Sequence, residues 1–73
     1  MKLMKLTLGQ KFRILRIQAG VSEADAAVLL KTAVGTYQKI EDDFIYPTES
    51  MINKTAKLYG ITYQQLLNIG EEE

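Results

Sequence analysis

Serine and threonine residues occur directly before segments in which apolar residues recur at helical spacing. Such residues mark the starts of short helices. Four residues occupy such positions: Thr7, Ser22, Thr48 and Thr62. A side-chain oxygen there can accept a hydrogen bond from the free backbone N–H groups at a helix start. Gln10 and Gln65 follow two of these caps by three residues and complete capping boxes, and Gly20 and Gly60 suit helix ends. With a break at Lys31-Thr32-Ala33, the pattern predicts five helices.

Apolar residues recur at helical spacing between these boundaries. Leu8, Phe12 and Leu15 follow one another at intervals of four and three, which places them on one helix face. The same spacing in the other segments predicts a single core. Its members are Phe12, Leu15, Ala27, Leu30, Tyr37, Ile40, Ile52, Ala56, Ile61 and Leu66. The chain is long enough for one domain over 1–73, with a core of about 7–68, a short N-terminal arm and an acidic C-terminal tail.

The missing residue types exclude several classes of function. The chain has no cysteine and no histidine, so disulfides, thiolate metal sites and the commonest general base are all absent. The remaining polar groups form no convergent pattern, and we expect no enzyme, no metal and no cofactor. The longest apolar run is far shorter than the roughly 20 residues of a membrane span. Residues 1–6 lack the features of a secretory signal. We therefore expect a cytoplasmic protein that does not enter a membrane.

Charge is distributed unevenly although the net charge is zero. The first 39 residues hold seven basic groups against Glu23 and Asp25, whereas residues 40–73 hold Lys54 and Lys57 against seven carboxylates. The positive half can approach phosphate even when the whole chain is neutral. Lys5, Lys11 and Lys31 are expected to be solvated or to contact phosphate, and Glu71-Glu72-Glu73 to be a frayed, solubilising tail.

Two helices of about nine residues, joined by a three-residue turn and preceded by a longer helix, form the helix-turn-helix plan. The sequence also resembles the Cro/CI-type (XRE-like) helix-turn-helix family, without a gap over about residues 7–68. The matching segments are Gly9-Gln10-Lys11-Phe12-Arg13-Ile14-Leu15-Arg16, Gly20-Val21-Ser22, Ala27, Leu30, Tyr37-Gln38-Lys39-Ile40-Glu41, Pro47-Thr48, Ala56-Lys57-Leu58-Tyr59-Gly60-Ile61 and Leu66. The resemblance implies an all-α, compact five-helix, lambda-repressor-like DNA-binding domain with the helix-turn-helix at its second and third helices.

The resemblance also implies roles for individual residues. The partner would be duplex DNA, with the third helix in the major groove. The positions that would face DNA are Ser22, Glu23, Thr32, Val34, Gly35, Thr36, Gln38 and Lys39. Arg16 and Glu41 match an ion pair that ties the first helix to the end of the third. The predicted function is a DNA-binding transcriptional regulator.

Several positions depart from the family pattern and keep an alternative open. Glu23 stands where glutamine is usual, Lys31 replaces a glycine of the turn, and Val34 cannot hydrogen-bond to a base edge. Asp42 and Asp43 make the following loop acidic. The alternative function is a helix-turn-helix domain used as a protein-interaction module, for example an antagonist of another repressor.

Apolar residues at unusual positions suggest contacts with other chains. Phe44, Ile45 and Tyr46 form a cluster that either packs over the protein's own core or provides a homodimer contact. Val28 and Leu29 stand where the family pattern expects exposed polar residues, so at least one of them is a candidate for a surface that binds a protein partner.

Overall fold

The structure, a computed structural model, describes residues 6–71, and this range contains five α-helices and no strand. The helices are α1 (Leu8–Gln18), α2 (Glu23–Leu29), α3 (Val34–Glu41), α4 (Glu49–Leu58) and α5 (Tyr63–Leu67). The prediction of an all-α, five-helix fold is confirmed for this range. α3 has eight residues, and Asp42 is its C-cap. The predicted N-terminal arm, Lys5 and Glu72-Glu73 lie outside the described residues.

Side-chain caps fix the starts of four helices. Thr7, Ser22, Thr48 and Thr62 each accept a hydrogen bond from the backbone N–H three residues further on, at 3.0–3.1 Å. The two capping boxes are complete. The start of α3 differs, because its N-cap is Ala33, which has no side-chain hydrogen-bonding group. The first backbone N–H groups of α3 therefore lack a side-chain partner.

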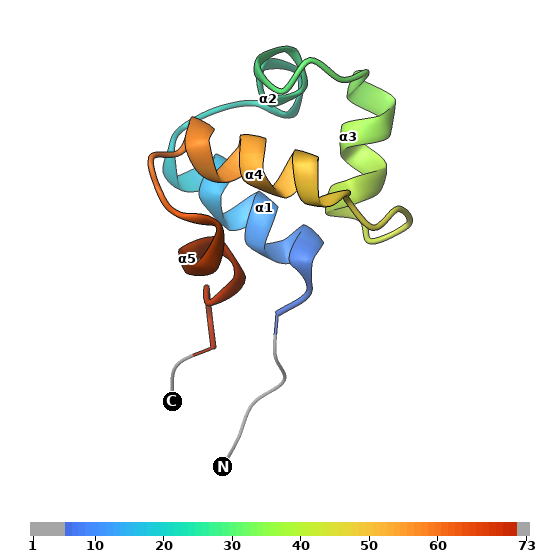
Figure 1. The fold of residues 1–73 in the computed structure, drawn as a ribbon. Coiled ribbons are helices and arrows are strands. Elements are labelled where there is room, and N and C mark those ends of the chain that lie inside the picture. The colour runs from blue at the N-terminus through green and yellow to red at the C-terminus, as the bar shows by residue number, and fades with distance from the viewer. Residues whose placement is uncertain (1–5, 72–73) are drawn as a thin grey trace.

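Several of the helices that pack together are not consecutive in the sequence (Figure 1). α2 packs against α3, α1 packs against both α3 and α5, and α4 packs against α5. Consequently α1 lies between the helix-turn-helix pair and the C-terminal part of the chain. None of the helices in residues 6–71 is long and apolar enough to span a bilayer.

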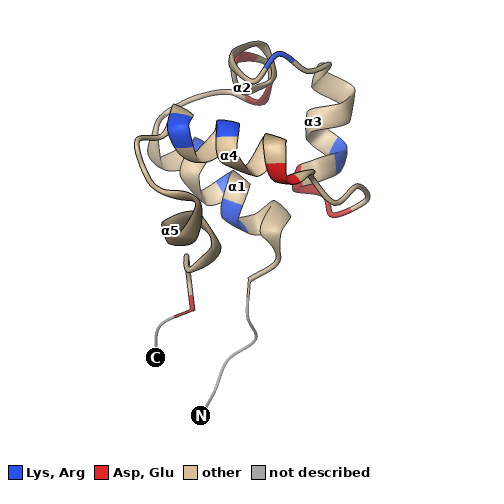
Figure 2. Cartoon of the chain, in the orientation of Figure 1, with Lys and Arg blue, Asp and Glu red and all other residues tan. Residues whose placement is uncertain are grey.

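Acidic and basic residues lie near opposite ends of α4 (Figure 2). The acidic positions at the end of α3 and in the loop after it lie near the start of α4. The basic positions of α4, Lys54 and Lys57, come further along the helix. The division into a positive and a negative half of the sequence therefore does not describe the folded surface.

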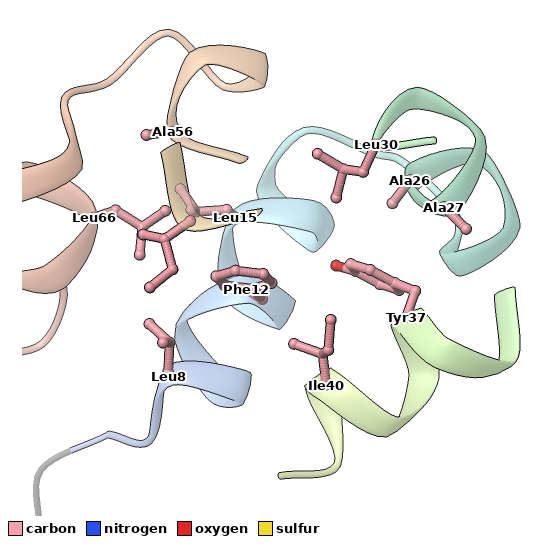
Figure 3. Packing of buried hydrophobic residues seen from close by; sticks show 11 residues of the cluster. Leu8, Phe12, Leu15, Ala26, Ala27, Leu30, Tyr37, Ile40, Ala56 and Leu66 are labelled. Carbon is pink, nitrogen blue, oxygen red and sulfur yellow. The ribbon is translucent and has the colours of Figure 1, made fainter. Parts of the chain in front are cut away.

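The core forms where α1, α2 and α3 meet the C-terminal helices (Figure 3). Its buried members are Leu8, Phe12, Leu15, Ala26, Ala27, Leu30, Tyr37, Ile40, Ile52, Ala56 and Leu66. The predicted core is confirmed except for Ile61, which is half-buried because it lies in the connection between α4 and α5, at the edge of the core. The rings of Phe12 and Tyr37 stack with centroids 6.5 Å apart, so α1 and α3 share an aromatic contact.

The backbone at the start of α1 lies against the end of α3, at Gly9. A Cβ atom on Gly9 would lie 2.5 Å from the carbonyl oxygen of Ile40 and 2.6 Å from that of Glu41. Asp43, with φ of 66°, turns its carboxylate back towards α1. It accepts hydrogen bonds from the Thr7 hydroxyl at 2.8 Å and the Gly9 N–H at 3.2 Å. This contact therefore joins the end of α3 directly to the start of α1.

Candidate nucleic-acid interface

The outward face of α3 carries most of the residues that the sequence assigns to DNA. Val34, Gly35, Thr36, Gln38 and Lys39 are all exposed, whereas Tyr37, Ile40 and Glu41 are buried. Val34 is 44% exposed, and a Cβ atom on Gly35 would meet nothing within 4 Å. An approaching duplex could therefore reach the backbone at the uncapped start of α3.

The start of α2 lies beside this face. The Ser22 hydroxyl accepts from the Asp25 N–H and so is used as a cap. Half-buried Glu23 accepts a hydrogen bond of 3.1 Å from the side-chain amide of Gln38. Thr32 is half-buried in the turn after Lys31, whose φ is 59°. Of the two long polar side chains on the outer face of α3, Gln38 is thus hydrogen-bonded to a carboxylate, whereas Lys39 takes part in no ion pair within residues 6–71.

Acidic residues at the end of α3 have partners within the protein. Asp42 pairs with Arg13 at 3.1 Å, and Asp43 caps the start of α1. The sequence reading took both as signs of a protein partner rather than DNA. Both residues thus have intramolecular contacts while they stay exposed, and the pairing with Arg13 reduces the negative charge that Asp42 presents to solvent.

Arg16 and Glu41 are brought together beneath the interface. Arg16 Nε lies 2.6 Å from Glu41 Oε2, and the Glu41 side chain is 0% exposed. Arg16 also donates to the carbonyl of Val21, and Arg13 Nε lies 3.2 Å from Glu41 Oε1. Burial acts to raise the pKa of Glu41, but the hydrogen bonds from Arg16 and Arg13 outweigh it and lower the pKa below its ordinary value of 4.5. The carboxylate therefore joins α1, α3 and the connection before α2.

A buried tyrosine adjoins this ion pair. Within the described range, the Tyr37 hydroxyl is enclosed near Glu41 without a hydrogen bond of good geometry. Burial, followed by the nearby Glu41 carboxylate, raises the pKa of Tyr37. The hydroxyl stays neutral in the folded protein, so the side that α3 turns inward holds only one ionised group, Glu41.

The loop after α3 presents apolar side chains to solvent. Phe44 is 80% exposed and Tyr46 is 78% exposed, while Ile45 is less so. The reading in which this cluster packs over its own core is therefore wrong for Phe44 and Tyr46. Val28 and Leu29 on α2 are also exposed, which leaves them accessible to another chain.

One lysine lies elsewhere than sequence reasoning placed it. Lys11 was expected to be solvated or to contact phosphate, but it is only 6% exposed. Its ammonium group donates to the Leu67 carbonyl and pairs with Glu71 at 3.1 Å. Because Lys11 lies on the side of α1 that faces α5, its long stem is covered while its charged end reaches the last turn. Glu71 is correspondingly part of the fold and not of a solvated tail.

Comparison with protein families agrees with this architecture. The family model described as "Helix-turn-helix domain" matches residues 7–68. The chain therefore belongs to the helix-turn-helix domain family, a class typical of DNA-binding regulators. A search of curated proteins gives no match.

Proposed function

We propose that this protein is a Cro/CI-type transcriptional regulator that docks α3 in the major groove of duplex DNA. The observation that carries the proposal is the open face of α3, where Gly35 lies in the uncapped first turn and exposed Lys39 lies in the last turn. α1 supports this helix from behind through Phe12, Gly9 and the Glu41 ion pair. A rigid helix with an exposed polar face matches the way in which recognition helices meet DNA.

The residues on this face suit contacts that position the protein on DNA better than contacts that distinguish one base from another. Lys39 and the N–H groups at the start of α3 suit phosphates, which fix the register of a protein on DNA but carry no sequence information. Val34 offers only an apolar contact for a thymine methyl group. We therefore propose weak sequence preference, with a contribution from DNA shape.

The test is binding to a pool of random-sequence duplexes, followed by fluorescence anisotropy over a series of salt concentrations. Lys39→Ala should weaken binding and reduce the slope of log affinity against log salt by about one, as expected for one lost phosphate contact. Lys54→Ala is the matched control, because Lys54 is an exposed lysine on α4, outside this face. Equal affinity of Lys39→Ala and the wild type across the salt series would rule out α3 as the DNA-binding surface.

The second candidate is a protein-interaction module, and exposed Phe44 and Tyr46 favour it. Large aromatic side chains are frequent anchors of protein interfaces. In the DNA-binding proposal the same cluster serves as a homodimer contact. Sedimentation of the wild type and of a Phe44→Ser/Tyr46→Ser variant separates the two cases. Loss of a wild-type dimer supports the homodimer contact, whereas a monomeric wild type that binds no duplex favours the interaction module.

A further inference from the structure

A shallow groove lies between the end of α2 and the second half of α4. Its lining residues are Leu29, Leu30, Lys31, Lys54, Lys57 and Leu58. Leu29 is 53% exposed and Leu58 is half-buried, so the groove has an apolar floor that water reaches. Three lysines surround that floor. The sequence places Lys31 in the positive half and the other two in the negative half, and only the fold brings them together.

These lysines have no counter-charge within the part of the chain that the structure describes. None of them takes part in the ion pairs or side-chain hydrogen bonds of residues 6–71. On α4, the positions three and four residues before Lys54 and Lys57 hold Ser50, Met51, Asn53 and Lys54, none of which is acidic. The acidic positions at the end of α3 lie at the other end of α4 (Figure 2). The groove therefore combines accessible apolar surface with unbalanced positive charge.

We propose that this groove binds an acidic, amphipathic helical segment of a partner protein. The apolar side chains of the segment would rest on Leu29 and Leu58, and its carboxylates would pair with the lysines. Helices bind apolar grooves in this way, with anchors on one face and charges at the rim. A DNA backbone fits less well, because it offers phosphates to the lysines but no apolar group to the leucines.

This surface is distinct from the proposed DNA interface. The groove uses the C-terminal ends of α2 and α4, whereas the DNA interface uses the start of α2 and the outer face of α3. The inference therefore goes beyond the proposed function and does not depend on it. A protein that binds here could act on a regulator without occupying α3.

The experiment uses the full chain and a fluorescein-labelled synthetic peptide in which Glu and Asp cover one helix face and Leu and Phe the other. Lys54→Glu/Lys57→Glu should weaken peptide binding by about tenfold or more, because it reverses two charges that attract the peptide. Leu29→Ser should weaken binding several-fold. Lys39→Glu, which reverses an exposed lysine on α3, should leave peptide binding unchanged. A second peptide, with Ser in place of Leu and Phe, should bind at least about tenfold more weakly.

Circular dichroism of each variant checks that it is folded, and Lys54→Gln/Lys57→Gln replaces the charge-reversal variant if that one is not. Three outcomes overturn the proposal. The first is no binding of the amphipathic peptide. The second is an equal loss for Lys39→Glu and the groove variant, which would mean general attraction to positive charge. The third is a groove variant that loses affinity for random-sequence duplex DNA while peptide binding is unchanged, which would assign the groove to DNA.

Discussion

The side-chain amide of Gln38 donates a hydrogen bond of 3.1 Å to the carboxylate of Glu23, and so joins the outer faces of α3 and α2. Glu23 occupies the first turn of α2, where a negative charge interacts favourably with the helix dipole. In the DNA-binding proposal, the same helix end faces phosphate. In that proposal, the Glu23 carboxylate stabilises the fold but weakens the binding of DNA.

Glu23→Gln is expected to strengthen DNA binding and to weaken the fold. Removing the negative charge should raise affinity for duplex DNA by about two- to fivefold, in line with the strength of charge interactions at helix ends. The free energy of unfolding should fall by about 0.3–1 kcal/mol. Anisotropy and urea unfolding measure the two effects. Glu49→Gln, at the same position of α4, is the matched control for the stability loss, and unchanged DNA affinity of Glu23→Gln would contradict the proposed surface.

Stability should fall in acid because of Glu41. Its pKa is lowered in the folded protein, so its ionised form stabilises the fold above the ordinary value of 4.5. That contribution is lost as the pH falls from 4.5 through the lowered pKa. Urea unfolding between pH 7 and pH 3 should show this decline. In Glu41→Gln the decline should be smaller, and the variant should be about 3 kcal/mol less stable at pH 7, because Arg16 is left without its buried partner.

A double variant separates the charge effect from packing. Arg16→Met/Glu41→Leu removes both charges and should be more stable than Glu41→Gln, since no buried charge is left unpaired. If the double variant is the less stable of the two at pH 7, the ion pair contributes more to stability than its desolvation costs, and this expectation is wrong.

Lys31→Gly should stabilise the protein. Lys31 has a φ of 59°, a left-handed conformation that is strained for a residue with a Cβ atom. Relief of that strain, less the greater freedom of glycine in the unfolded chain, should raise the free energy of unfolding by about 0.5–1 kcal/mol. Gly20→Ala is the opposite control, because Gly20 has a φ of 71° and nothing within 4 Å of an added Cβ atom. It should lose about 1 kcal/mol, and chemical denaturation of both variants checks the pair.

Two glycines in helices should respond to alanine with opposite signs. Gly9→Ala must displace the carbonyls of Ile40 and Glu41, and overpacking of this kind costs about 1–3 kcal/mol. Gly35→Ala meets open space and should gain about 0.8–1 kcal/mol from the higher helix propensity of alanine. Thermal unfolding compares the two variants, and a stabilised Gly9→Ala would mean that α1 and α3 can separate without loss.

The helices could be predicted from the sequence because their signals are local. A cap such as Thr62 and its partner Gln65 lie three residues apart, so the sequence shows both halves of the contact. Core positions such as Phe12 and Tyr37 followed from helical spacing. Ala26 was not assigned to the core, although it is fully buried in the structure.

Side-chain partners distant in sequence could not be predicted in this way. The contact of Asp43 with Gly9 joins residues on opposite sides of the helix-turn-helix, and no residue near Asp43 in the sequence indicates it. Lys11 has the composition of a surface residue, yet the packing of α1 on α5 covers its stem. The lysine groove arises in the same way, because its members become neighbours only when α4 folds back beside α2.

The close contact at Gly9 also determines where flexibility can enter a complex with DNA. The carbonyls of Ile40 and Glu41 lie directly against the backbone of α1, and Asp43 is hydrogen-bonded to Thr7. We therefore expect α3 to move together with α1. In the proposed complex, we expect a mismatch between the protein and a binding site to be absorbed by curvature of the duplex. Two sequences with identical bases at the contacted positions would be distinguished by how readily the DNA between those positions bends.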